Sequence, residues 1–558
     1  MTFTPYGGER YLDFDQLTAW CREAAESLPD WVSLDAVGQS RFGRPIWALT
    51  LGAAGEGRGE RPGFWLDGGT HASEFTGVMA ALFCASRWIA ALLDADPAAL
   101  AWFSRHTVTI LPCLSPDGFD ALCKGAPFMR STLRPPLEGA VRIGLDPQDL
   151  DGDGAVRWMR WRHPAGPCVP DADEPLFMRP RRIDDDPSEA FFVAQEGLFL
   201  SWDGARWTQA SLKHGMDLNR NFPGSWAPFS MFGMDGGLFP LSEPESRAAV
   251  DAFAARPHLA AAITNHTYTG CLLTQPYRAE TPLERPDIDL MEALARDAVE
   301  GTGYDVFKVH PDFNYDPKRP TVGVWADTLA TIFGVPGYTL ELWNPMKYAG
   351  IEVKNPIDAF MRPEPEATQA LIARFAQDPT LRRPWTPFEH PQLGPVELGG
   401  LEYLRTVRNP PEPLLAEECR RGFTIIDRVR RALPRVTAAA TVEALAPDLW
   451  RLELILENHG FLPTSGLAHG ARIGASPAVS ATLIPGEVQI VEGTAAQALQ
   501  HLEGWGQSRV GATRNVIYPG LPALGHRARA TWLLRGHGPV EIAWIAGRAG
   551  RGRLSVHP

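Results

Sequence analysis

Four short, almost entirely apolar runs constrain the fold of this chain most strongly. Each run is short enough for a strand, and patterns typical of amphipathic helices stand before and between them, such as residues 13–29 and 289–303. Strands that are apolar along their whole length are buried on both faces, as in parallel or mixed sheets covered by helices. The sequence therefore predicts an α/β domain. The four runs are GFWLDGGT (63–70), TVTILPCLSPDGF (107–119), AAITNHTY (261–268) and GYTLELW (337–343).

Composition excludes several classes of protein. The 558 residues carry a net charge of -13 without a basic stripe, so we expect no nucleic-acid partner. We expect no membrane span, because no apolar run approaches the necessary length. The N-terminus lacks the pattern of a signal peptide, and the seven scattered cysteines form no CxxC pair. These features predict a cytoplasmic protein with reduced thiols, made without an activation segment.

Changes in pattern along the chain predict three parts. The α/β pattern covers residues 1–385, interrupted at 131–215 by an irregular insertion rich in Asp, Pro, Arg and Trp that we expect over the mouth of a site. Residues 386–435 read as a Pro- and Gly-rich linker followed by a helix. In 436–558 the apolar residues alternate with period two between Gly and Pro turns, which predicts an antiparallel β-sandwich accessory domain.

Chemistry-bearing side chains stand at the ends of the apolar runs. His71 and Glu74 lie three residues apart at a strand-to-helix turn, and His266 ends a later run. Two imidazoles and a carboxylate form a three-ligand zinc site that keeps a coordination position open for water. Glu341, after another strand, is then the candidate general base for that water. These residues predict a zinc-dependent hydrolase.

Six motifs in order resemble the zinc carboxypeptidases of the carboxypeptidase A type (the M14 family). The resemblance spans roughly residues 33–380 and implies that family's mixed, eight-stranded-type sheet flanked by helices. It also implies that His71, Glu74 and His266 bind zinc and that Glu341 is the base. The motifs are VGQSRFGRPIWALTLG, GGTHASE, ILPCLSPDGF, DLNRNFPG, NHTYTG and YTLEL.

The same resemblance implies the residues that hold the substrate. Asn219 and Arg220 would bind its terminal carboxylate, for which a guanidinium is well shaped. The run RWMRW makes Arg160 the candidate that polarises the scissile carbonyl, with Arg157 and Arg162 as alternatives. Tyr268 would line the cleft and follow a cis peptide bond.

Two features depart from the family pattern. The tyrosine expected about twenty residues before the base is missing at that spacing, so either Tyr315 or Arg319 would close over the substrate terminus. The residues shortly before the base, which read the terminal side chain in the family, are apolar. Asp327 is interpreted as a helix cap, or as a pocket residue that favours a basic side chain if the register shifts.

A second metal site is a further hypothesis. Asp149, Asp151 and Asp153 with Gly154 reproduce the first half of a calcium loop. Arg160 stands where a closing glutamate belongs, so a standard EF-hand is excluded. Calcium would need further oxygen ligands, and the alternative is a solvated acidic turn.

Three functions are consistent with this pattern. The first is a zinc metallocarboxypeptidase acting on peptides with a free carboxylate. The second is a zinc amidase or deacylase acting on cell-wall peptides or acylated amino acids. The third, a non-catalytic peptide-binding protein, is disfavoured because it would not need Glu341. The sequence leaves side-chain specificity and oligomeric state open.

Overall fold

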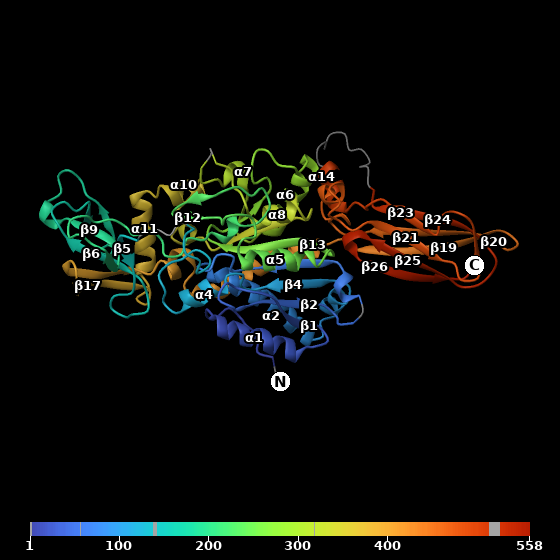
Figure 1. Ribbon diagram of the computed structural model, residues 1–558, viewed down its shortest axis with the longest axis horizontal. Helices are drawn as coiled ribbons and strands as arrows, with labels where there is room; N and C mark the ends of the chain where they lie inside the picture. The colour runs from blue at the N-terminus through green and yellow to red at the C-terminus, as the bar shows by residue number, and fades with distance from the viewer. Residues whose placement is uncertain (1–2, 56, 138–141, 317–318, 513–524) are drawn as a thin grey trace.

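The computed structural model describes residues 3–558 except 56, 138–141, 317–318 and 513–524. It is an elongated molecule with a central α/β domain and a β-rich part at each end (Figure 1). We call the end formed by residues 144–200 and 382–401 the insertion lobe. The other end, residues 436–558, is the C-terminal sandwich.

One mixed sheet of eight strands forms the middle of the central domain, which confirms the predicted fold class. Its four inner strands are almost wholly buried, as their apolar runs require. Strands β4, β3, β13 and β16 are parallel to one another, and a strand antiparallel to its neighbour flanks them on each side, β2 beside β4 and β14 beside β16. In order across the sheet the strands are β1 (Val32–Gln39), β2 (Pro45–Leu51), β4 (Thr107–Leu111), β3 (Gly63–Asp67), β13 (Leu259–Thr267), β16 (Gly337–Leu342), β14 (Cys271–Thr274) and β15 (Asp305–Lys308).

Helices cover both faces of this sheet. The core of one face contains side chains of α1 (Phe14–Ser27), α2 (Phe75–Leu93), α6 (Arg285–Val299) and α12 (Glu412–Arg431). The core of the other face contains side chains of α5 (Pro244–Ala254) and α8 (Trp325–Thr331). The remaining helices of the central domain are α3 (Pro97–Phe103), α4 (Pro116–Cys123), α7 (Val309–Asp312), α9 (Pro345–Tyr348), α10 (Pro356–Met361) and α11 (Pro365–Ala376).

Helix α2 qualifies the expectation about membrane spans. Its 19 residues are long and apolar enough to cross a membrane by length and composition, and 78% of the relevant window is buried inside the structure. The helix packs between the sheet and α12 and is a core helix of the central domain.

The insertion lobe corrects the predicted domain boundaries. Residues 386–401 are not a linker, because β17 and β18 complete a six-stranded sheet with strands of the insertion. Its core contains Met159, Trp161, Val396 and Leu398. The sheet order is β17 (Arg382–His390), β18 (Gly394–Leu401), β6 (Trp158–Arg162), β9 (Phe191–Gln195), β7 (Cys168–Pro170) and β8 (Met178–Pro180); β5 (Gly144–Pro147) and β10 (Gly197–Leu200) pair beside it.

The C-terminal sandwich consists of two four-stranded antiparallel sheets, as the period-two pattern predicts. Their facing side chains form one core that includes the buried Trp532. Helices α13 (Ala468–Arg472) and α14 (Trp505–Ala512) lie between its strands in the sequence. The first sheet has the order β19 (Val436–Ala446), β20 (Leu449–Asn458), β24 (Arg527–Arg535) and β22 (Gln489–Glu492). The second has the order β23 (Ala496–Leu499), β21 (Val479–Ile484), β25 (Val540–Ala546) and β26 (Arg551–Val556).

Candidate active site

The structure brings His71, Glu74 and His266 together at one edge of the central sheet. His71 and Glu74 occupy the turn between β3 and α2, where the Glu74 N–H donates to the His71 carbonyl. His266 lies near the end of β13. The Nδ1 atoms of the two histidines are 3.0 Å apart, and each lies 2.9 Å from one Glu74 carboxylate oxygen. The predicted three-ligand cluster is therefore present.

Buried partners fix the orientation of both imidazoles. His71 Nε2 lies 3.2 Å from Asp217, and His266 Nε2 lies 3.3 Å from the Thr264 hydroxyl. Thr264 in turn donates to Asp67, whose pKa burial raises to about 6. Such partners on the far nitrogen leave Nδ1 of each ring free to bind a metal.

This arrangement fits a zinc ion. Zinc–nitrogen bonds of about 2.0–2.1 Å at tetrahedral angles separate two ligand atoms by about 3.3 Å, close to the 3.0 Å between the two Nδ1 atoms. Burial opposes ionisation of Glu74, but the charges of His71 and His266 hold its pKa well below the usual range. The carboxylate therefore stays ionised, as a metal ligand must.

Glu341 stands directly beside these ligands. Strands β13 and β16 are parallel neighbours, and their register pairs His266 with Glu341. Glu341 is half-buried and lines the same cavity as Glu74. Desolvation raises its pKa to about 7, while the charge of His266 opposes this rise. A carboxyl group with a pKa near neutrality is suited to accept and return a proton.

A cavity of about 940 Å³ opens in front of this centre, and Arg130 lines it. Arg130 Nε donates to Asp217 at 3.1 Å, and its Nη1 lies 3.7 Å from Glu74. The Asp217 and Glu74 charges raise the pKa of Arg130 against the effect of burial, so it remains a cation. Arg130 is thus a cavity-lining cation beside the metal ligand Glu74, a position from which a guanidinium can donate to a carbonyl oxygen.

The prediction that Arg160 polarises the carbonyl needs correction. Arg160 lies in β6 of the insertion lobe, donates to Glu397 at 2.8 Å and stacks over Trp385, away from the cavity-lining set. The two alternatives also form lobe ion pairs, Arg157 with Asp153 and Arg162 with Glu189. The insertion between residues 131 and 215 had shifted the apparent alignment.

Asn219 and Arg220 form a short 3-10 turn (Leu218–Arg220) directly after Asp217. Arg220 lines the cavity, stacks 5.0 Å above the Phe229 ring and keeps a buried Nε without a hydrogen-bond partner among the described residues. Asn219 is buried, and its Oδ1 accepts the Trp325 N–H at 2.9 Å. Arg220 therefore fits the carboxylate-binding role, while the Trp325 N–H holds Asn219 through its Oδ1 and binding of a carboxylate by Asn219 stays a prediction.

The tyrosine candidates line the cavity and the arginine candidate does not. Tyr268 and Tyr315 are both cavity residues, and the Thr267–Tyr268 peptide bond is cis, as expected. Arg319 is exposed and contacts Asp316 at 3.6 Å outside the cavity-lining set. Tyr315 therefore remains the candidate for closing over a substrate terminus.

Asp327 fits neither predicted role. It lies inside the first turn of α8, whose N-cap is Val324, and it is buried. Its carboxylate accepts hydrogen bonds from Gln275 and Ser225 at 2.9 Å. It does not belong to the residues that line the cavity.

The predicted calcium loop connects β5 to β6 in the insertion lobe. Carboxylate oxygens of Asp149, Asp151 and Asp153 lie within 4.8 Å of one another. Arg383 pairs with Asp151 at 2.7 Å and also with Asp153, which Arg157 contacts at 2.8 Å. These arginines already compensate the acidic charge, and calcium binding stays a prediction.

Fold and site together define a protein with a His-Glu-His centre, suited to a metal ion, at the edge of a mixed α/β sheet. The model of the zinc carboxypeptidase family matches residues 17–150 and 197–368, more than half of the chain. This protein belongs to the zinc carboxypeptidase family. A second model, a domain of unknown function (DUF8731), matches residues 436–557, which are the C-terminal sandwich.

Individual relatives match shorter segments. Mouse carboxypeptidase A2 is 31% identical over 139 residues, covering 25% of this chain and 30% of its own. Carboxypeptidase B of the crayfish Astacus astacus is 28% identical over 109 residues, covering 20% and 34%. The matches thus span about a third of these relatives. The solved carboxypeptidase A of Helicoverpa armigera is 17% identical, with a TM-score of 0.41 over 66% of this chain and 74% of that one.

The family match shows which signal would have found Arg130. The matched residues stop at 150 and resume at 197, so Arg130 lies inside the family segment and Arg160 lies in the gap. Arg408 is a further cavity residue that the sequence did not indicate. Arg408 follows the matched segments, in a stretch whose sequence pattern predicts a linker.

Proposed function

We propose that this protein is a zinc-dependent carboxypeptidase that removes the C-terminal residue of peptides. The observation that supports this most directly is the common cavity. It contains the metal ligand Glu74, the base Glu341, and the two arginines Arg130 and Arg220. A substrate whose terminal carboxylate pairs with Arg220 would present its last peptide bond to Glu341 and Arg130.

Each side chain has a separate task in this proposal. A bound zinc ion would polarise the scissile carbonyl and make water a stronger nucleophile at neutral pH. Glu341 would accept the proton of the attacking water and deliver it to the leaving amine nitrogen. Arg130 would donate hydrogen bonds to the carbonyl oxygen as negative charge develops there. Tyr315 would cover the end of the substrate.

A matched substrate panel tests the proposal. We expect the zinc-loaded protein to release the last residue from blocked dipeptides with a free C-terminal carboxylate. The same dipeptides with a C-terminal amide should react far more slowly, because Arg220 has no anion to bind. Equal rates on both would contradict the carboxypeptidase assignment.

The amidase or deacylase hypothesis uses the same centre and differs in the acyl side of the substrate. Acylated amino acids and cell-wall peptides belong in the same panel for that reason. Metal analysis accompanies the assay, since a protein without zinc and without turnover would be a binding protein. Location in the cytoplasm stays a prediction, which fractionation of the producing cells would test.

A further inference from the structure

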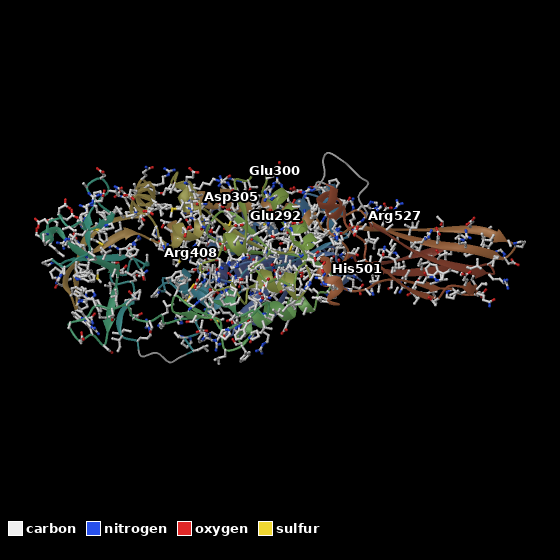
Figure 2. The ribbon with its side chains drawn as sticks, turned by 90° about the horizontal axis from the view of Figure 1, so that it is seen from above. Glu292, Glu300, Asp305, Arg408, His501 and Arg527 are labelled. Carbon is white, nitrogen blue, oxygen red and sulfur yellow. The ribbon has the colours of Figure 1, made fainter. Side chains whose placement is uncertain are left out.

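A short segment beyond the family match contributes to the catalytic cavity. After β18 the chain forms a π-helical turn, η4 (Leu404–Arg408), and the matched residues end at 368. Arg408 is 7% exposed and lines the cavity together with Glu74 and Glu341. Figure 2 labels Arg408 at the side of the central domain that faces the insertion lobe.

Arg408 is held rigidly against the metal centre. Its Nη1 donates to Glu74 Oε1 at 3.3 Å and to the Thr267 carbonyl at 3.1 Å. Its Nη2 donates to the Tyr403 hydroxyl at 3.0 Å, and its guanidinium stacks 5.1 Å from the Tyr268 ring centre. A guanidinium stays protonated at neutral pH in proteins. A permanent positive charge therefore stands beside the reaction centre.

The charges around the centre leave room for a substrate with two negative groups. Among the described residues, four acidic side chains and five lysine or arginine side chains line the cavity, so a divalent cation adds two further uncompensated positive charges. A terminal carboxylate neutralises one of them, and an unpaired charge out of water is costly. The nine side chains are Glu74, Asp146, Asp217, Glu341, Arg130, Arg142, Lys213, Arg220 and Arg408.

Arg220 and Arg408 enter the cavity from different elements. Arg220 belongs to the turn that follows Asp217, the partner of His71. Arg408 arrives from η4 and contacts Glu74 instead. With the terminal carboxylate at Arg220, as the proposed function requires, Arg408 is available to the part of the peptide before the scissile bond.

We propose that Arg408 is a substrate-binding residue that pairs with a carboxylate on the residue preceding the scissile bond. The proposal rests on the carboxypeptidase function above and adds a substrate class to it. The enzyme would prefer peptides with an acidic penultimate residue. Tyr403 holds the Arg408 side chain in place for this contact.

Two blocked dipeptides that differ in one functional group test this preference. N-acetyl-Glu-Leu and N-acetyl-Gln-Leu have the same shape, and only the first carries the second carboxylate. We expect wild type to cleave the Glu peptide with a kcat/KM about tenfold higher or more, mainly through KM, because a charged hydrogen bond is lost with Gln. In Arg408→Met the ratio should fall to about one.

Arg405→Met is the matched control. Arg405 lies in the same turn, is exposed and contacts Glu402 at 3.8 Å. This variant should keep the wild-type ratio. Should Arg408→Met not fold, Arg408→Lys serves in its place and should reduce the ratio without abolishing it, because lysine keeps the charge and loses the fork geometry.

Binding gives a readout that does not depend on turnover. In a Glu341→Gln background, calorimetry should show about tenfold weaker binding of the Glu peptide on Arg408→Met, with the Gln peptide little changed. Loss of zinc together with equal losses on both peptides would make Arg408 a positioning residue for Glu74 and overturn the proposal.

The outcomes separate the two proposals. If wild type cleaves both peptides equally well, the carboxypeptidase function stands and the role of Arg408 is wrong. If wild type with bound zinc cleaves neither these peptides nor any in the wider panel, the proposed function fails, and the role of Arg408 fails with it.

Discussion

The insertion lobe and the C-terminal sandwich are both β-sheet additions, and they meet the central domain in different ways. From the insertion lobe, Trp158 and Gln195 line the catalytic cavity. None of the described residues of the C-terminal sandwich does so. The two parts lie at opposite ends of the molecule (Figure 1).

The docking of the sandwich explains this difference. Arg548, buried at the start of its last hairpin turn, donates to the carbonyls of Pro257, Leu259 and Phe333 at 2.8, 2.7 and 2.5 Å. Leu259 begins β13, whereas His266 lies near its other end. Seven residues of strand separate the two by about 23 Å. The comparison predicts that the addition at the metal-bearing edge affects substrate binding, while the one at the far edge affects stability.

The largest effect is expected at the metal centre of the central domain, to which both β-sheet additions are attached. Glu341→Gln removes the base, so kcat should fall about 10²- to 10⁴-fold while zinc content stays unchanged. Glu397→Gln in the insertion lobe, which loses only the pair with Arg160, should retain activity. Steady-state kinetics with metal analysis measures both variants. Wild-type activity of Glu341→Gln would show that Glu341 is not the base.

A second pair of variants tests the corrected arginine. Arg130→Met should lower kcat about 10²- to 10³-fold, because it removes donors aimed at the reacting oxygen. Arg160→Met should leave kcat within about twofold of wild type, since Arg160 is bound to Glu397 within the lobe. Comparable losses in the two variants would mean that the lobe itself supplies catalytic groups.

The sandwich should act on stability alone. Arg548→Met leaves several buried carbonyls without donors and should lower the free energy of unfolding by about 3 kcal/mol. Below the unfolding transition kcat should be unchanged. Arg551→Met, at an exposed position paired with Glu60, is the control and should have little effect. Denaturant unfolding and activity are measured on the same samples. A loss of kcat in the folded Arg548→Met protein would show that the sandwich also affects catalysis.

The pH dependence provides a smaller effect. Burial raises the pKa of Glu341 to about 7 in the metal-free protein. Glu341 must be ionised to act as the base, so kcat/KM should fall as the pH drops through the pKa that it has in the zinc-loaded enzyme. Positive charge favours the ionised carboxylate, so a bound zinc ion lowers the pKa of Glu341. The acid limb of the pH–rate profile, where kcat/KM falls, therefore moves to lower pH. Arg130 lowers the pKa of Glu341, and Arg130→Met should therefore move the limb to higher pH. Arg160→Met should leave the acid limb where it is in wild type. The pH–rate profiles of wild type, Arg130→Met and Arg160→Met test this.

The smallest effect is expected at the rim. Trp158 is 41% exposed on the cavity side of the insertion lobe. Trp158→Ala should raise KM about two- to fivefold for peptides of four or more residues and leave blocked dipeptides unaffected. Ile183→Ala, on a fully exposed part of the lobe, is the matched control. An identical KM for long peptides in wild type and Trp158→Ala would mean that substrates do not reach the lobe.

The metal centre and the central sheet could be predicted because their signals are local. His71 and Glu74 stand three residues apart, and His266 and Glu341 end apolar runs that could only be buried strands. In parallel strands these ends meet at one edge, so position along each strand was enough to bring the four groups together.

The remaining site residues depend on contacts between distant segments. Arg130 stands just before the predicted insertion and was missed because the RWMRW run inside the insertion drew the assignment to Arg160, which lies in the gap of the family match. Arg408 and the strands before it looked like a linker, since β18 pairs with β6 more than two hundred residues earlier. Period and composition describe a segment, and they do not name the segment with which it pairs.

The shared sheet of the insertion lobe sets an order on how the chain is assembled during synthesis. Strand β6 is an interior strand, with β9 on one side and β18 on the other. At about 5–20 residues per second, the ribosome needs on the order of 10–40 s to extend from β9 to β17. For that time β6 has one open edge, of the kind that recruits other chains. Anything that slows translation across the intervening helices prolongs this exposure.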